Sequence, residues 1–436
     1  MKILLKNAHV LTMDDAYTEY ENGYVLTEDD RILAVGSGQL PPADRVVDCR
    51  GGILLPGFVN LHCHASMVPF RTMGDDCPDR LRRFLFPLEN EALTPELVYL
   101  GAKYGIGEML LSGITTFVDM YYFEEEVARA CLETGMQGFL GETVISQKTP
   151  DSEGDEGGLL LTEDFLRKYA VSDRIHPIVA PHGTTTVSES ALRACGELAN
   201  RYDALLTLHV SEMDYEMEYF RQQGLTPIGY LDRLSLLSDR LLAAHCIHLS
   251  EEDLLRMQKT GVRMAHCIGS NAKAGKGIAP VRDAAAHGIS FGFGTDGPSS
   301  GNTLSLFDQM RLFAVTQKTR YHDRSLFHAK EIVRAATRGG AECLHLGDRY
   351  GMLAPGYHAD LQVVSAQSEH MFPLYNPYSA LVYSACAADV DLVMAAGQIV
   401  VEQHRLTGWS LGDLREALRR AMAGFYAAAE KYREII

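Results

Sequence analysis

The stretch LLPGFVNLHCHASM (Leu54–Met67) combines a Pro-Gly turn, a short apolar run and two histidines, His62 and His64. Side chains at positions i and i+2 of a strand emerge on the same face, so the two imidazoles would lie side by side. Burying two imidazoles at the end of an apolar strand costs free energy unless their nitrogens find partners. A divalent metal ion chelated by both rings is a partner that satisfies them.

Seven further apolar runs follow the first, and amphipathic stretches of helical type alternate with them. The eight runs are GFVNLHCH, ITTFVDMYY, GFLGETVI, IHPIVAPH, LLTLHVSE, LLAAHCIH, VRMAHC and ISFGFGTD. Near-continuous apolar runs are typical of parallel strands buried on both faces. Eight such units within residues 56–348 predict a (β/α)8 barrel. A doubly wound parallel sheet is the alternative, but it does not require eight units, and no glycine-rich phosphate motif follows the first run.

The two ends of the chain have a different pattern, in which short β-type runs are separated by turns. Residues 1–55 contain KILLKNAHVLTM and NGYVLTEDDRILAVG, and residues 349–436 contain HADLQVVSAQ and DVDLVMAAGQIVVEQHRL. Neither end alone supplies enough strands for a closed core, so we expect both ends to pair in one small β-sandwich domain. The stretch SLGDLREALRRAMAGFYAAAEKYREI near the C-terminus predicts an amphipathic helix packed outside the barrel.

Composition excludes some classes of function. The net charge of −17 opposes a nucleic-acid partner, because phosphate binding needs clustered Lys and Arg. The nine cysteines are scattered and odd in number, which favours free thiols in a reducing compartment. The N-terminus does not have the pattern of a signal peptide, and no apolar stretch approaches the ~20 residues of a membrane span. We therefore expect a cytoplasmic protein without a membrane or nucleic-acid partner.

Most of the eight runs end in a polar residue. The C-terminal ends of barrel strands form one rim, so these residues would converge there. His209 ends the fifth run and Asp296 ends the eighth; with His62 and His64 they form a His3Asp set that suits Zn2+ or Fe2+. A single His at a strand end is more often a hydrogen-bonded core residue than a ligand, so the prediction depends on the whole set.

These motifs resemble the metal-dependent amidohydrolase superfamily. The resemblance is carried by GFVNLHCH, LHVSE, AAHCIHL, FGTDG and YGMLAPGYHADLQVV, and it runs from the first strand to the last helix. The chain is most similar to the S-adenosylhomocysteine and methylthioadenosine deaminase branch, which also resembles chlorohydrolases and guanine deaminases. The resemblance implies a (β/α)8 barrel with a small β-sandwich built from both chain ends, and a homo-oligomer, either a dimer or a tetramer.

The resemblance also implies the roles of the site residues. The metal ligands would be His62, His64, His209 and Asp296, around one divalent ion, Zn2+ or alternatively Fe2+. The catalytic residues would be Glu212, His245 and Asp296.

The reaction expected of this set is hydrolytic deamination, in which a ring amine becomes a carbonyl and ammonia is released. A metal with an open position lowers the pKa of bound water toward neutrality. Asp296 would accept the proton of the nucleophile, Glu212 would protonate the ring nitrogen next to the attacked carbon, and His245 would position the nucleophile.

Cyclic-amide hydrolysis is an alternative reaction within the superfamily. Relatives of that kind bridge two metals with a carboxylated lysine at the end of the fourth strand. The fourth run here ends in IVAPHG, with His182 and no lysine, which favours one metal and deamination. A barrel that has lost catalysis and serves as a scaffold is a third possibility, but such relatives typically lack ligands that this chain has.

The expected substrate is an adenine nucleoside. The resemblance implies that Glu89, in FPLEN, holds the ribose hydroxyls and that His182 faces the heterocycle. Ser300, just past the expected ligand Asp296, is the third expected substrate-binding residue. An acidic residue in a first helical turn is the other interpretation of Glu89.

The 5' group is expected to be neutral. Relatives that take S-adenosylhomocysteine place arginines after the third strand, where this chain has Glu142 and Leu159. Repulsion of a carboxylate tail there would favour adenosine, 5'-deoxyadenosine or methylthioadenosine. The alternative substrate is another amino-heterocycle, such as guanine, an oxopurine, a pterin or a triazine.

Overall fold

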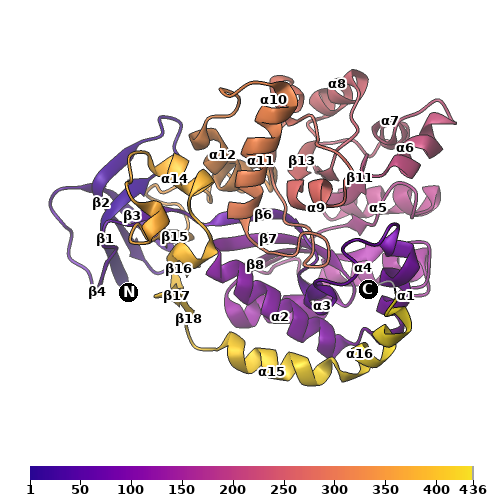
Figure 1. The fold of residues 1–436 in the computed structure, drawn as a ribbon, viewed down its shortest axis with the longest axis horizontal. Helices are drawn as coiled ribbons and strands as arrows, with labels where there is room; N and C mark the ends of the chain where they lie inside the picture. The colour runs from indigo at the N-terminus through magenta and orange to yellow at the C-terminus, as the bar shows by residue number, and fades with distance from the viewer. Residues whose placement is uncertain (435–436) are drawn as a thin grey trace.

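The computed structural model describes residues 1–434 and contains a barrel with a curved sheet beside it (Figure 1). The barrel strands are β6 (Phe58–Cys63), β7 (Ile114–Tyr121), β8 (Gln137–Val144), β9 (Ile175–Pro177), β10 (Ala180–Pro181), β11 (Leu206–Val210), β12 (Leu241–His245), β13 (Arg263–His266) and β14 (Phe291–Phe293). Each pairs in parallel with its neighbour along the chain, except that β9 and β10 both pair with β8 and share the place of the fourth strand. The predicted parallel strands are therefore present.

Two sets of backbone hydrogen bonds close the barrel. The Val179 amide donates to the Leu205 carbonyl at 2.9 Å, which joins the fourth strand to β11. The Asp296 amide donates to the His62 carbonyl at 3.0 Å, which joins the last strand to the first. The closed parallel arrangement confirms the predicted (β/α)8 barrel.

Burial on both faces explains why the strand sequences are so apolar. Every residue of β6, β7 and β8 is buried. Alternate side chains fill the barrel interior, including Val59, Leu61, Val118, Phe139 and Leu242. The others pack outward against the helices, as parallel strands in a barrel require.

Helices surround the barrel and link its strands (Figure 1). They are α1 (Phe86–Ala92), α2 (Pro95–Leu111), α3 (Glu124–Thr134), α4 (Asp155–Lys168), α5 (Glu189–Arg201), α6 (Asp214–Arg221), α7 (Pro227–Arg233), α8 (Glu251–Thr260), α9 (Ile268–Lys273), α10 (Val281–Ala286), α11 (Leu306–Tyr321), α12 (Ala329–Ala336) and α13 (Arg338–Cys343). Several begin at hydroxyl caps that the sequence encodes: Thr94, Ser188 and Ser250 each accept a backbone amide of the first turn.

The two ends of the chain pair in one sheet, which has nine strands within residues 1–434. Its strands are β1 (Lys2–Leu11), β2 (Glu19–Glu28), β3 (Arg31–Ser37), β4 (Arg45–Asp48), β5 (Ile53–Pro56), β15 (Leu361–Val364), β16 (Val390–Ala395), β17 (Gln398–Glu402) and β18 (Arg405–Leu406). The antiparallel pair β5–β15 joins the N-terminal strands to the C-terminal ones. The sheet has its own core, which includes Leu5, Val10, Leu361 and Met394.

The C-terminal segment forms two helices rather than one, α15 (Leu411–Ala421) and α16 (Ala423–Ala429), which follow α14 (Pro377–Tyr383) along the chain. Both run along the outside of the barrel helices (Figure 1). Phe425 packs against Phe70 with ring centroids 4.8 Å apart. Ile435, the last residue of the predicted helix, lies outside the described residues.

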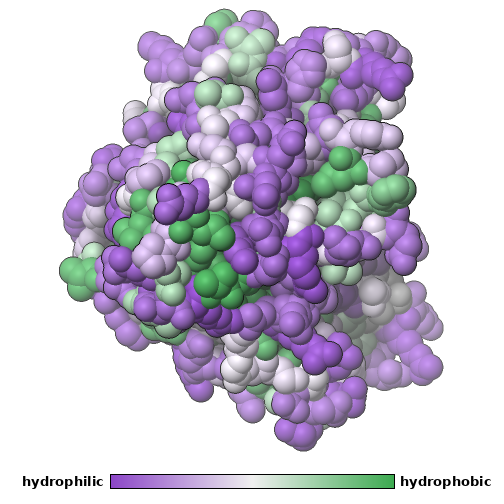
Figure 2. All heavy atoms as spheres, turned by 90° about the vertical axis from the view of Figure 1, so that its left-hand side faces the viewer, coloured by the Kyte–Doolittle hydropathy of each residue, from purple (hydrophilic) through white to green (hydrophobic). Residues whose placement is uncertain are grey.

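The small sheet also presents apolar side chains to the surface. Figure 2 shows hydrophobic patches on an otherwise hydrophilic face, the left-hand side of Figure 1. Large apolar side chains exposed on this sheet and its loops include Leu33, Leu40 and Val46.

No helix within residues 1–434 combines the length and apolarity required to cross a bilayer.

Candidate metal centre

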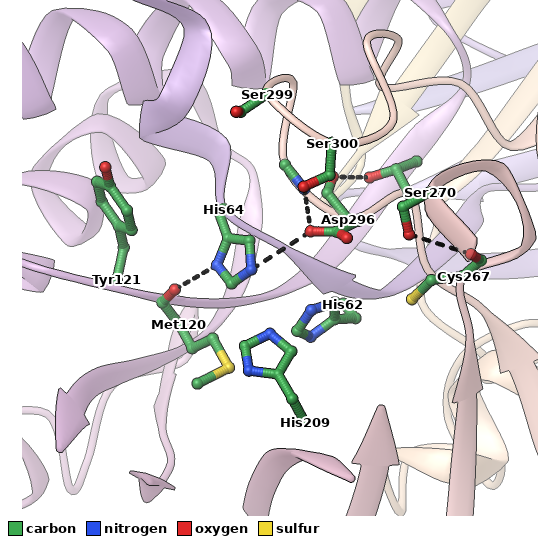
Figure 3. Close-up of polar contacts among 12 residues, drawn as sticks. His62, His64, Met120, Tyr121, His209, Cys267, Ser270, Asp296, Ser299 and Ser300 are labelled. Atoms are coloured by element: carbon green, nitrogen blue, oxygen red, sulfur yellow. Dashed lines mark hydrogen bonds and ion pairs between the residues drawn. The ribbon is translucent and has the colours of Figure 1, made fainter. Parts of the chain in front are cut away.

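The predicted ligands meet at the rim of the barrel. His62 lies at the end of β6 with His64 just beyond it, His209 lies in β11, and Asp296 follows β14. The ligand atoms of His62, His64 and Asp296 lie within 4.8 Å of one another, and those of His62, His209 and His245 do so as well. Figure 3 shows the imidazoles of His62, His64 and His209 and the carboxylate of Asp296 grouped around one space.

Hydrogen bonds orient three of the imidazoles. Nδ1 of His64 donates to the Met120 carbonyl at 2.6 Å, and Nδ1 of His209 donates to the His182 carbonyl at 2.6 Å. Nδ1 of His245 donates to Oδ1 of Asn271 at 2.8 Å. Each bond fixes the tautomer in which Nε2 keeps its lone pair, the form that a metal ligand needs.

The donor set fits a divalent metal. Within residues 1–434, neither ring nitrogen of the fully buried His62 has a hydrogen-bond partner, and Nε2 of His245 has none. Burial and neighbouring imidazoles lower the pKa of His62 and of His209, which keeps both rings neutral. Burial alone would raise the pKa of Asp296, but the facing imidazoles, His64 first, hold that pKa below its ordinary value. Neutral imidazoles at His62 and His209 and an ionised carboxylate at Asp296 suit Zn2+ or Fe2+.

Glu212 lies next to this cluster. Its Oε1 is 3.7 Å from Nε2 of His245 and contacts the Lys276 ammonium. Burial raises the pKa of Glu212, but His245 and Lys276 outweigh burial and bring the pKa to about 2. Glu212 is therefore a carboxylate in the free protein.

A cavity of about 810 Å³ opens over the cluster, and the predicted substrate residues Glu89, His182 and Ser300 line it. Glu89 is buried and accepts a hydrogen bond from the Tyr121 hydroxyl at 2.7 Å. Desolvation raises the pKa of Glu89 to about 8. Two of the carboxyl groups that line the cavity thus have opposite pKa shifts: Glu212 beside the metal cluster and Glu89 beside Tyr121.

His182 and Ser300 lie on two other parts of the wall. Nδ1 of His182 lies 2.8 Å from Oγ1 of Thr186, and burial lowers the pKa of His182 to about 4, so the ring is neutral. Oγ of Ser300 accepts a hydrogen bond from Arg80 at 2.8 Å. All nine predicted site residues therefore face one cavity or its floor.

The expected repulsion by Glu142 and Leu159 is wrong, because neither residue lines the cavity. The Glu142 carboxyl turns away and accepts the backbone amides of Phe123 at 3.1 Å and Glu124 at 3.0 Å, at the start of α3. Leu159 lies on α4, outside the barrel. The structure gives no reason at these positions for the 5' group to be neutral.

Sequence reasoning missed Asn271, Lys276, Tyr121 and Arg80, of which the last three line the cavity. Asn271 and Lys276 come from SNAKAGKG, which begins in α9 after β13 and ends in a lysine between two glycines, a sign of a loop that folds over the rim. The aromatic pair at the end of the second strand, Tyr121 and Tyr122, could have pointed to Tyr121. Arg80 has no comparable signal in the sequence.

The fold and the site together define a class: a barrel protein with a candidate metal centre of His and Asp side chains at the rim of its strands. A sequence model described as the amidohydrolase family matches residues 53–400. This chain belongs to the amidohydrolase family, as the resemblance of its motifs predicted.

Relatives with similar sequences are named deaminases. A 5-methylthioadenosine/S-adenosylhomocysteine deaminase of Syntrophobacter fumaroxidans is 37% identical over 96% of this chain and 97% of its own length. One of the same name from Pyrococcus horikoshii is 38% identical over 92% of this chain and 95% of its own.

Solved structures of similar fold include two enzymes. The crystal structure of an adenosine deaminase from Xanthomonas campestris with bound zinc is 29% identical, with a TM-score of 0.94 and 98% coverage of both chains. An atrazine chlorohydrolase from Arthrobacter aurescens has a TM-score of 0.90 at 24% identity, with coverage of 96% of this chain and 100% of its own, and supports the fold alone.

Proposed function

We propose that this chain is a metal-dependent aminohydrolase that deaminates an adenine nucleoside and holds one divalent ion, Zn2+ before Fe2+. It is thus a hydrolase of C–N bonds. The observation that carries the proposal is the grouping of His62, His64, His209 and Asp296 at the floor of a cavity that Glu212 also lines. The deaminase names of the relatives and the zinc of the Xanthomonas adenosine deaminase support it.

The residues of the chain divide the proton transfers between them. A divalent ion at the cluster, when bound, supplies a nucleophile at neutral pH by lowering the pKa of water. Asp296 is ionised and can take a proton from the nucleophile. Glu212, a carboxylate in the free protein, would first take a proton from water and then deliver it to the ring nitrogen next to the attacked carbon, which weakens the aromatic resistance to addition; the proton taken by Asp296 would go to the departing amine, which leaves as ammonia. His245, fixed by Asn271, orients the nucleophile.

Glu89 gives the reason for a nucleoside rather than a free base. Its buried carboxyl lines the cavity with Tyr121 as a hydrogen-bond donor to Oε1. A carboxylate there can accept the two vicinal hydroxyls of a ribose, each in a charge-assisted hydrogen bond. His182, held neutral, would then face the heterocycle.

An ammonia-release assay of the zinc-loaded protein tests this function. The substrates are adenosine, 5'-deoxyadenosine, methylthioadenosine and S-adenosylhomocysteine, compared with guanine, a pterin and an amino-triazine. We expect release from the adenine nucleosides. Release from guanine, the pterin or the triazine alone would overturn the adenine nucleoside as substrate and retain the chemistry. No release from any of them would overturn deamination.

We also propose a cytoplasmic homo-oligomer, a dimer or tetramer, without a nucleic-acid or membrane partner. All nine cysteines lie in the described part of the chain and are free thiols, in line with a reducing compartment. The exposed apolar side chains of the small sheet are of the kind that subunit contacts cover. Light scattering of the purified protein tests the oligomer, and a monomer would contradict it.

A further inference from the structure

Lys276 places a cation in the wall of the cavity that no step of the proposed reaction uses. Its ammonium contacts Oε1 of Glu212, the carboxylate that also lies 3.7 Å from Nε2 of His245. The side chain lines the cavity and is 24% exposed. Glu212 thus lies between His245, which belongs to the metal cluster, and the ammonium of Lys276.

The backbone around Lys276 is built to hold it there. Gly275 and Gly277 have φ angles of +66° and +121°, which side chains with a Cβ rarely adopt. The Lys276 amide donates to the Asn271 carbonyl at 3.0 Å. The Asn271 side chain accepts from His245, so one residue anchors both the lysine loop and the imidazole.

An ammonium in this place can distinguish substrates by the substituent on the ring carbon that lies beside Glu212. Lysine has three N–H donors and no acceptor, and Glu212 takes one of them. In a 6-aminopurine whose N1 engages Glu212, the next ring atom is C2. A hydrogen at C2 cannot accept a hydrogen bond from the Lys276 ammonium, and an amino group at C2 would place a second donor against it. A carbonyl oxygen at C2 can accept the hydrogen bond.

We propose that Lys276 determines specificity by donating a hydrogen bond to an oxygen on the ring carbon next to the nitrogen that Glu212 engages. The inference rests on the proposed function and narrows its substrate class to 2-oxo-6-aminopurine nucleosides. Adenosine is then a slower substrate, and 2,6-diaminopurine riboside is slower still.

A different role for Lys276 makes a different prediction. If the lysine only balances the charge of Glu212, its loss changes the rates of all substrates by the same factor. If it binds a ring oxygen, its loss changes the ratio between substrates. The ratio therefore separates substrate recognition from a structural ion pair.

The experiment measures kcat/KM of the zinc-loaded protein for the ribosides of 2-oxo-6-aminopurine, adenine and 2,6-diaminopurine. For the wild type we expect a preference for the 2-oxo compound over adenosine of about 10- to 100-fold, the range for a hydrogen bond to a charged group. Lys276→Met should bring this ratio close to one, and Lys276→Arg should restore part of it. Lys273→Met is the matched control, because that ammonium is held by Asp75 and Asn302, and it should keep the wild-type ratio.

Each outcome bears on one proposal. Equal rates for adenosine and the 2-oxo compound in the wild type would overturn the role of Lys276 and leave nucleoside deamination standing. The same result follows if Lys276→Met keeps the preference. If the wild type deaminates none of the three ribosides, the proposed function itself fails. Equal wild-type rates would overturn the role of Lys276 without any variant, so the proposal can be contradicted even if Lys276→Met does not fold.

Discussion

Oδ1 of Asn271 lies 2.8 Å from Nδ1 of His245, and this contact fixes which nitrogen of the imidazole faces the metal cluster. The His245 ring is fully buried, and its Nε2 is 3.7 Å from Glu212. A substitution of Asn271 would therefore change the orientation of the His245 ring without removing a contact to the substrate.

We predict that Asn271→Leu lowers kcat/KM about 10- to 100-fold, the usual effect of losing a partner that orients a ring at a metal site. Asn271→Asp is the matched variant, since its carboxylate still accepts the Nδ1 proton, and it should retain more activity. Steady-state kinetics with metal analysis of both variants check this. Wild-type kinetics of Asn271→Leu would remove the positioning role.

Glu212→Gln should keep the metal and lose most of the turnover. The amide cannot take up and deliver a proton, and general acid–base groups contribute about 10²- to 10⁴-fold to rates. Kinetics and metal content of the same preparation give the result. Glu218→Gln, a change on the exposed face of α6, is the control. A Glu212→Gln enzyme with near wild-type activity would exclude the proton-transfer role.

Glu89→Gln should raise KM for nucleosides much more than for the corresponding free bases. The comparison is made at pH 8.5, above the Glu89 pKa of about 8, where the variant keeps the shape of the side chain and lacks the carboxylate that would hold two ribose hydroxyls. A similar rise in KM for nucleosides and free bases would show that Glu89 does not bind the ribose hydroxyls.

Glu89 also predicts a pH dependence. Burial raises its pKa from 4.5 to about 8, so the protonated form dominates at neutral pH. Ribose hydroxyls donate best to the carboxylate, and KM for a nucleoside should therefore fall as pH rises from 6.5 to 8.5. Because the pKa of Glu89 is higher in the folded protein, the free energy of unfolding should also fall as pH rises from about 4.5 to about 8. Glu89→Gln should remove the KM trend, and a trend that persists in this variant would assign it to another group.

Glu142→Ala tests whether that carboxyl caps α3 instead of facing the substrate. Loss of its two backbone hydrogen bonds should lower the free energy of unfolding by about 1–3 kcal/mol, measured by urea denaturation. The ratio of kcat/KM between methylthioadenosine and S-adenosylhomocysteine should stay unchanged. A rise in activity toward S-adenosylhomocysteine relative to methylthioadenosine would indicate that the Glu142 carboxyl faces the substrate after all.

The sequence predicted the barrel because eight apolar runs need burial on both faces. It predicted that the candidate metal ligands come together, because strand ends of a barrel share one rim, so distant residues such as His62 and Asp296 must come close. Glu142 was misplaced because, near the end of a strand, alternation alone does not decide which way a side chain turns. Lys276 was missed because its direction depends on two left-handed glycines in a loop, which no periodic pattern describes. The split of the C-terminal helix at Met422 had no signal either.

Metal analysis combined with anomalous diffraction from zinc-loaded crystals tests the central claim most directly. We predict one equivalent of zinc per chain, bonded to His62, His64, His209 and Asp296, and loss of both zinc and ammonia release in His62→Ala with His209→Ala. Zinc bound elsewhere, or full activity after the metal has been removed by a chelator, would contradict the account.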